Sequence, residues 1–242
     1  MKIRLSVPKG LFALLIISLS VMIYTSSFFN VLYDRTFFSE FYEEHGVEEE
    51  VEHPTQKSAE IVAYLNGEIT TLDDENPVFA DKGLDDAEIR HLEDVKEFIM
   101  GLKAAYLISF TLFVLLTSSF IIALFLRKDK EAWRKARIFF MKLQVYVIAV
   151  CSVSLLLIWL LTSFGFDWLF RSFHELAFQE GTWTFAPGTL SLILFPSSIY
   201  GAFMSEILFN VLVFVLMLSM LFMFIYIIYR PRHSKNLEHP GN

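Results

Sequence analysis

Residues 84–103, LDDAEIRHLEDVKEFIMGLK, decide the fold because they join an acidic helix start to a long apolar stretch. The Asp-Asp pair near the start can cap the helix, since a short carboxylate accepts hydrogen bonds from the first free N–H groups. Helical spacing then puts Glu88, His91 and Asp94 on one strip, three residues apart. His91 therefore lies where a polar helix start meets an apolar stem, and a histidine there can exchange protons at a membrane surface.

The apolar residues of the chain fall into four long blocks. The sequence is 55% hydrophobic, whereas a soluble domain is about 45–50% apolar. Each block exceeds the roughly 20 residues that a helix needs to cross about 30 Å of hydrocarbon. The blocks, which we interpret as transmembrane helices, cover residues 11–32, 104–126, 138–164 and 199–229. The sequence thus predicts a polytopic α-helical membrane protein.

The first block has an alternative interpretation as a cleaved signal peptide, because residues 1–10 have the basic character such a peptide requires. The apolar run is too long for that role, and residues 24–30 (YTSSFFN) lack a small-x-small cleavage site. We therefore favour an uncleaved anchor.

The distribution of charge predicts the orientation. Basic residues concentrate in the first ten residues, in the connection 127–137 and in the tail 230–242, so these parts and both termini are expected in the cytoplasm. Residues 34–97 carry 20 acidic residues and five basic ones, so the segment 33–103 is expected outside, together with the segment 165–198. The net charge of −7 averages two opposite faces. The basic stretches are short and follow from topology, so a nucleic-acid partner is not expected.

The first external segment contains a signal for a β-hairpin. Residues 61–65 and 68–72 are short β-type runs that flank Asn66-Gly67, and such a dipeptide between two runs is typical of a tight hairpin turn. Residues 78–80 are expected to add another short strand. Together with the helix that begins near Asp86, these strands predict a small extracellular α/β cap on the helix bundle.

The second external segment is more apolar. Residues 167–178 (DWLFRSFHELAF) are amphipathic and rich in aromatic side chains, which predicts an interfacial helix that carries Arg171 and His174. Residues 190–195 form an apolar run too short to span a membrane. This run is either partly inserted or a strand that joins the predicted hairpin.

Two histidines are candidates for chemistry, because only His91 and His174 lie on predicted helices at the outer face, each near a carboxylate. Glu88 and Asp94 would complete a set of metal-ligand types, but HExxH and CxxC spacings are absent, and we expect no metal. Phosphate-binding glycine motifs are also absent, and we expect no cofactor. Cys151 lies inside a predicted span, where an inert packing role is the default. Without a nucleophile elbow, the histidines suit acid–base catalysis in which the substrate supplies the nucleophile.

Two patches of sequence resemble a known family, the lipoprotein intramolecular transacylases (Lit) of Gram-positive bacteria. The first patch is Glu88-x-x-His91-x-x-Asp94-Val95-Lys96, before the second span. The second patch consists of Phe173-His174, Phe178, Trp183, Pro187, Leu192-Ile193 and Phe195-Pro196. The chain departs from the family pattern at Glu180-Gly181, where the family tends to have an asparagine, and at Leu190, where it often has an aspartate.

The resemblance implies a specific reaction at the outer face of a bacterial cytoplasmic membrane. Family members move the sn-2 acyl chain of an S-diacylglyceryl-cysteine to the α-amine of the same cysteine, giving a lyso-form lipoprotein. His91 aligns with the essential catalyst and His174 with the second histidine, while Glu88, Asp94, Arg171 and Trp183 are expected to support them. The expected partners are a diacylated lipoprotein and membrane lipid, and we expect a monomer without an acyl-enzyme intermediate.

Composition and topology alone also fit another class. A non-enzymatic membrane protein whose extracellular cap binds a ligand or a partner would show the same four apolar blocks. The two external histidines favour the enzyme. The short basic loops on the cytoplasmic side offer no signalling domain that a sensor would need.

Overall fold

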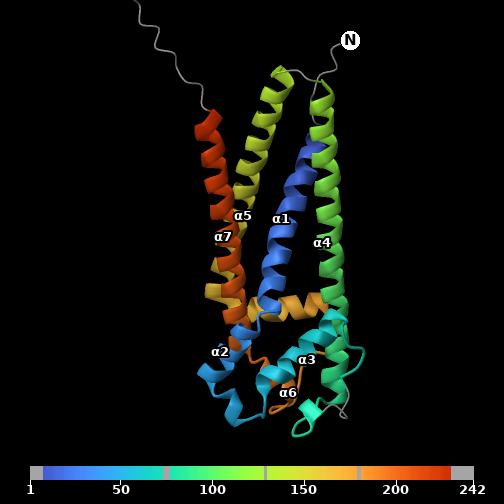
Figure 1. Cartoon of the computed structure of the whole chain (residues 1–242). Helices are drawn as coiled ribbons and strands as arrows, with labels where there is room; N and C mark the ends of the chain where they lie inside the picture. Colours follow the sequence, from blue (N-terminus) through green and yellow to red (C-terminus); the bar gives the residue numbers. More distant parts are fainter. Residues whose placement is uncertain (1–7, 73–76, 128–129, 179–180, 230–242) are drawn as a thin grey trace, which may run out of the picture.

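Four long helices form an elongated bundle (Figure 1). The structure is a computed structural model that describes residues 8–72, 77–127, 130–178 and 181–229. The long helices are α1 (Lys9–Leu32), α4 (Asp86–Arg127), α5 (Lys130–Ala177) and α7 (Ser197–Tyr229). Each is long and apolar enough to cross a membrane, which confirms the prediction of four membrane helices.

Helix α1 lies at the centre of the bundle, where it contacts α4, α5 and α7. Between these helices Val147, Cys151 and Val211 are fully buried, and Cys151 packs beside Ser20. Many large apolar side chains, such as Leu107 on α4, instead point outward and are exposed. Water would make such an apolar exterior unfavourable, whereas the hydrocarbon of a bilayer accommodates it.

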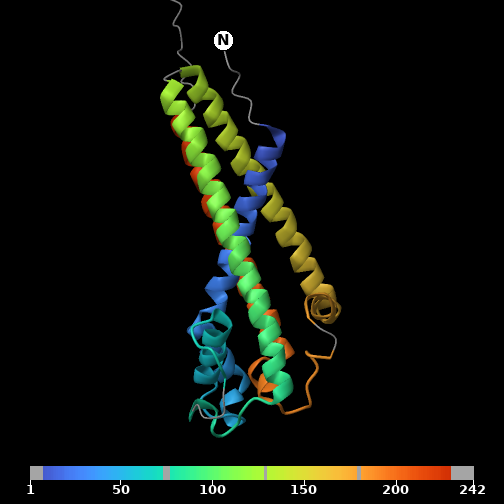
Figure 2. The same cartoon turned by 90° about the vertical axis from the view of Figure 1, so that its right-hand side faces the viewer.

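A helical cap covers one end of the bundle (Figures 1 and 2). It contains α2 (Arg35–His45), α3 (Pro54–Asn66), α6 (Leu190–Leu194) and the 3₁₀ turns η1 (Val47–Glu49) and η2 (Pro77–Phe79). Its core includes Tyr42, Ile61, Leu190 and Leu194, all fully buried. The cap therefore has its own apolar core, to which residues from both segments that the sequence predicts to be external contribute.

The predicted α/β character of the cap is wrong, because the described residues contain no strand. Residues 61–65 lie in α3, which starts with Pro54 in its first turn and buries Ile61, Tyr64 and Leu65 at helical spacing. Gly67 ends this helix with φ +80°, and its N–H and that of the next residue donate to Tyr64 O (3.0 Å) and Ala63 O (2.9 Å). This left-handed glycine makes a Schellman cap instead of a hairpin turn.

Two of the other expected strands are helical, whereas residues 68–72 form bends and irregular structure. Residues 190–194 form the short helix α6, and the segment around residue 78 is the turn η2. Leu190 and Leu194, four residues apart, are both fully buried on one side of α6. A short apolar run is compatible with either secondary structure, and here the packing against the cap selects a helix.

Helix α5 bends sharply at Gly165, the one described residue within it whose backbone is not helical (φ −153°, ψ 35°). The part before the bend runs along the bundle, and the part after it runs across the bundle toward α4, at the border with the cap (Figure 1). Figure 2 shows this last part nearly end-on. The predicted helix 167–178 is therefore present, as the transverse end of α5.

Candidate active site

The start of α4 is fixed by reciprocal hydrogen bonds. The side chain of Asp85 accepts from the N–H groups of Ala87 (2.8 Å) and Glu88 (2.9 Å), and the Glu88 carboxylate accepts from the N–H of Asp85 (2.8 Å). This arrangement has the bonds of a capping box, with aspartate in place of the usual serine or threonine. It sets the direction of the first turns of α4, on which His91 follows one turn later.

Glu88 also ties α4 to α6. Its side chain is 1% exposed, and its second carboxylate oxygen accepts a hydrogen bond from the N–H of Ser191. A buried carboxylate requires such partners, because burial of an unpaired charge is very unfavourable. Both oxygens of Glu88 therefore bind backbone N–H groups, so the residue supports the site through the fold.

His91 and His174 lie next to each other. One belongs to the first turns of α4 and the other to the transverse end of α5, 83 positions later in the sequence. Their ring centroids are 6.1 Å apart, and the ring planes differ by 24°. The structure thus brings together the two histidines that the sequence singled out, and the bend at Gly165 makes this approach possible.

An aromatic enclosure surrounds the pair. The ring of His91 lies 5.0 Å from Phe178 and 5.5 Å from Phe185, measured between centroids. The ring of the second histidine lies 4.0 Å from Phe170 and 5.3 Å from Trp183. Trp183 was among the predicted supporting residues, whereas Phe185 was not. These four side chains form a low-polarity wall, which we call the aromatic enclosure.

The two rings differ in their hydrogen bonds. Nδ1 of His174 lies 2.8 Å from the carbonyl oxygen of Phe170. A carbonyl only accepts, so Nδ1 carries the proton and Nε2 of the neutral ring has a free lone pair. Nδ1 of His91 is buried and has no hydrogen-bond partner among the described residues. His91 therefore has a ring nitrogen that another group can engage.

Burial keeps both imidazoles neutral. Desolvation lowers the pKa of His91 to about 4, and the neighbouring His174 adds to this effect. Asp94 acts in the opposite direction and raises the pKa of His91. Desolvation also lowers the pKa of His174, although its bond to the Phe170 carbonyl acts in the opposite direction. At neutral pH both rings are therefore uncharged, and each is a weaker base than an ordinary histidine.

The remaining predicted residues take different places. Asp94 is half-buried, and its carboxylate accepts a hydrogen bond of 2.9 Å from the hydroxyl of Thr182. This contact links α4 to the segment after α5, and no signal in the sequence pointed to Thr182. Arg171 is exposed, and it forms no hydrogen bond or ion pair with any residue that the structure describes. It is thus available to a ligand but is not part of the enclosure.

The expected ligand types do not form a metal site. Within the described ranges, no three His, Cys, Asp or Glu side chains are arranged to hold an ion.

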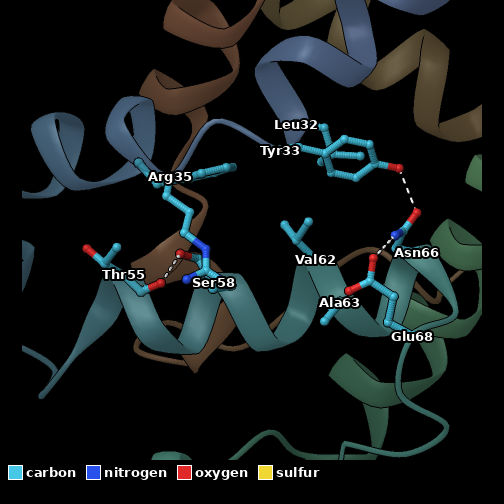
Figure 3. Close-up of a pocket in the computed structure, with 11 residues that line it drawn as sticks. Leu32, Tyr33, Arg35, Thr55, Ser58, Val62, Ala63, Asn66 and Glu68 are labelled. Atoms are coloured by element: carbon cyan, nitrogen blue, oxygen red, sulfur yellow. Dashed lines mark hydrogen bonds between the residues drawn. The ribbon is translucent and has the colours of Figure 1, made fainter.

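A cavity of about 280 Å³ lies elsewhere in the cap, between the end of α1, the start of α2 and α3 (Figure 3). Arg35 lies on one side of it and Asn66 and Glu68 on the other, and neither histidine lines it.

The sequence matches the profile of one family, described as "Lipoprotein intramolecular transacylase Lit", over residues 10–199. The match runs from the second residue of α1 to beyond the end of α6 and includes both histidines. The chain belongs to the lipoprotein intramolecular transacylase family. Comparison with curated proteins gives no match.

Solved structures of a transacylase from this family share the fold. The membrane-integral lipoprotein intramolecular transacylase Lit from Bacillus cereus superposes with a TM-score of 0.72 at 14% identity, covering 92% of this chain and 97% of that chain. Two further structures of the Bacillus cereus transacylase carry a histidine replaced by arginine or by alanine. Their TM-scores are 0.69 and 0.67 at 14% identity, and they cover 92% and 89% of this chain and 93% and 92% of theirs.

Membership of the transacylase family makes this chain a membrane-integral acyltransferase whose substrate class is lipoproteins. The resemblance noted in the sequence is thereby confirmed, and the four apolar helices agree with it. An intramolecular transacylase moves an acyl group within one substrate molecule. Such a transfer requires that a proton leave the attacking group and that one reach the leaving group.

Proposed function

We propose that the chain moves the sn-2 acyl chain of the S-diacylglyceryl-cysteine of a lipoprotein to the α-amine of that cysteine, with His91 as the acid–base catalyst. The observation that carries the proposal is the pair of histidines, 6.1 Å apart, inside the aromatic enclosure. The product is the lyso-form lipoprotein. Family membership favours this enzyme over a non-enzymatic binding protein.

The free nitrogen of His91 suits the first half of the reaction. The α-amine attacks the carbonyl carbon of the sn-2 ester, and a C–N bond forms while the carbonyl oxygen becomes an oxyanion. The attacking nitrogen then carries a positive charge and loses its proton readily, so a neutral imidazole can accept it. The pKa of about 4 means that His91 is neutral at the pH of the reaction.

The second half returns the same proton. The tetrahedral intermediate collapses, the bond between the carbonyl carbon and the glycerol oxygen breaks, and the His91 imidazolium protonates that oxygen. Asp94, which raises the pKa of His91, stabilises the imidazolium while it exists. The substrate contributes both the nucleophile and the leaving group, so an acyl-enzyme is not required.

The oxyanion requires hydrogen-bond donors. Nδ1 of His174 already donates to Phe170, and Nε2 of the neutral ring can only accept, so neutral His174 is suited to orient the amine or to accept a proton. The indole N–H of Trp183, the guanidinium of Arg171 and backbone N–H groups near Gly181 remain as candidate donors. In a low-polarity enclosure such donors stabilise an oxyanion strongly.

We infer that the site faces the outside of a bacterial cytoplasmic membrane. The helix ends that carry Lys9, Arg127 and the basic residues of 130–137 lie at the end of the bundle opposite the cap, which supports cytoplasmic termini, while residues 1–7 and 230–242 lie outside the described residues. The enclosure lies at the border of the bundle and the cap. At that depth the acyl chains of a lipoprotein stay in lipid while the ester and the amine reach the histidines. One chain holds the whole pair, which supports a monomer.

Mass spectrometry of a lipoprotein's N-terminal peptide tests the proposal. A reporter lipoprotein is purified from cells that contain the wild-type chain, His91→Ala, His174→Ala or His45→Ala, and from cells without the chain. His45 lies on α2 and contacts Phe41, away from the enclosure, so its variant is the matched control. We expect an N-acyl S-monoacylglyceryl cysteine with the wild type and the control, and its loss with His91→Ala.

Two outcomes would contradict the proposed mechanism. Full product with a folded His91→Ala variant would remove His91 from the reaction. A product with one acyl chain fewer and a free α-amine would show hydrolysis of the ester instead of transfer. A synthetic substrate that carries a label on its sn-2 acyl chain shows which acyl chain is transferred to the nitrogen.

A further inference from the structure

A second cavity lies at the end of the bundle opposite the cap. It has a volume of about 560 Å³ and lies between the first turns of α1, the last part of α4 and the first part of α5. The start of α1, the last part of α4 and the first part of α5 all lie at this end of the bundle (Figures 1 and 2). The volume is within the range of about 300–1,000 Å³ that is typical of small-molecule sites. It is far from the histidines, at the other end of the bundle.

The inner wall of the cavity is apolar and aromatic. Phe12 on α1 makes edge contacts with Phe139 at 5.2 Å and with Tyr146 at 5.6 Å, both on α5. Phe120 on α4 lies 5.0 Å from Phe139. Small side chains leave the space that these rings frame: Ala13, Ala132 and Ala136. A hydrocarbon chain would fit such a wall better than a free ion in water would.

The rim of the cavity is cationic. Lys9, Lys135 and Lys142 line it, and no acidic residue is among its described lining residues. Lys135 and Lys142 are seven residues apart on α5, so they lie on one face about 10 Å apart along the axis. Glu131 lies 3.5 Å from Lys135 but also accepts two bonds of 2.7 Å from Arg134. The charge of Lys135 is therefore only partly compensated.

We propose that this cavity binds one anionic phospholipid of the inner leaflet. Its phosphodiester lies among the three lysine ammonium groups, and an acyl chain follows the aromatic wall formed around Phe12. Basic pockets between membrane helices on the cytoplasmic side suit anionic headgroups. The combination of a cationic rim with an apolar wall selects an amphiphile over a free phosphate ion. The proposal does not depend on the acyl-transfer mechanism.

Native mass spectrometry of the purified full chain tests the proposal directly. Dissociation constants are measured in detergent for phosphatidylglycerol, phosphatidylcholine and inorganic phosphate. We expect phosphatidylglycerol to bind at least about tenfold more tightly than phosphatidylcholine. The double variant Lys135→Gln/Lys142→Gln should weaken phosphatidylglycerol binding about thirtyfold, because each lysine near an anionic headgroup contributes about a factor of five. Inorganic phosphate should not compete.

Two further variants separate charge from shape. Ala13→Phe fills the cavity from an exposed position without changing any charge, and it should abolish binding of both lipids. Lys130→Gln/Arg137→Gln removes two charges from the same end of α5 outside the cavity and leaves Arg134 paired with Glu131, so it should change phosphatidylglycerol binding less than about threefold.

Three results would overturn the proposal. They are an equal loss of binding in the control double variant, equal affinity for phosphatidylcholine, and displacement of the lipid by inorganic phosphate, which would indicate a free-anion site. Reaction of buried Cys151 with a thiol-reactive dye on heating reports whether each variant is folded. If Lys135→Gln/Lys142→Gln fails to fold, Ala13→Phe decides, because unchanged binding in that variant excludes the cavity.

Discussion

Replacement of Glu88 should detach α6 from α4. In Glu88→Ala the partly buried backbone N–H of Asp85 and the buried N–H of Ser191 lose their acceptor. A hydrogen bond to a charged group contributes about 1.5–3 kcal/mol, so the pair contributes about 3–6 kcal/mol. Glu88→Gln keeps one acceptor oxygen but turns an NH₂ group toward the other N–H. We expect the glutamine variant to lose about half of that stability or slightly more.

The assay follows thermal unfolding through Cys151, which is fully buried and becomes reactive when the helices separate. For a chain of this length, about 2–4 °C corresponds to 1 kcal/mol, so Glu88→Ala should lower the unfolding temperature by about 6–24 °C. Hydrogen–deuterium exchange at the Ser191 amide should accelerate in the same variant. Glu93→Ala is the matched control, since Glu93 is exposed on the same helix.

The reasoning is refuted if Glu88→Ala unfolds within about 1 °C of Glu93→Ala. Unchanged exchange at the Ser191 amide would refute it as well. Loss of transacylase activity with unchanged stability and unchanged exchange would place Glu88 in the chemistry, a role that its two backbone bonds do not suggest.

Three further predictions follow from the same structure. Because burial holds the pKa of His91 at about 4, below the ordinary 6.5, its contribution to stability is complete above pH 6.5 and is lost as the pH falls toward 4; unfolding temperatures from pH 7.5 to 4.5 should fall more steeply for the wild type than for His91→Gln, and parallel curves would contradict this. Asp81→Asn should destabilise the cap by about 2 kcal/mol, since it removes the ion pair of the fully buried Lys57. Identical denaturation curves for the wild type and the variant would contradict this prediction. Thr182→Val should lower the transacylation rate severalfold and the unfolding temperature by only about 2–4 °C, because Asp94 loses a hydrogen bond of about 1 kcal/mol. Valine in place of the exposed Thr184 should change neither.

The spans and the two histidines could be predicted from the sequence because their signals are local. Four apolar blocks of sufficient length define the membrane helices, and the polar start of α4 marks His91. The contact between His91 and His174 has no local signal, since it crosses 83 positions. It depends on the bend at Gly165, and a single glycine in an apolar helix does not specify a direction.

Gly67 explains why the sequence predicted a β-hairpin in the cap where the structure has a helix end. A glycine with positive φ satisfies both a hairpin turn and a helix C-terminus, so Asn66-Gly67 is compatible with either. The burial of Ile61 and Tyr64, three residues apart, decides for the helix, and it depends on packing with other parts of the cap. The role of Glu88 as a link to α6 could likewise not be predicted from the sequence, because its partner is the backbone N–H of Ser191 and not a particular side chain.

The low pKa of His91 is suited to expulsion of the leaving group, the step that limits many acyl transfers. A weak base is a poor partner for an α-ammonium of pKa about 8, but the nitrogen becomes far more acidic once the C–N bond has formed. The imidazolium of such a base is in turn a strong acid, and it transfers its proton readily to the departing glycerol oxygen. The aromatic enclosure, which lowers the pKa by desolvation, thus favours expulsion of the leaving group. Asp94, fixed by Thr182, limits that effect so that the imidazolium can form.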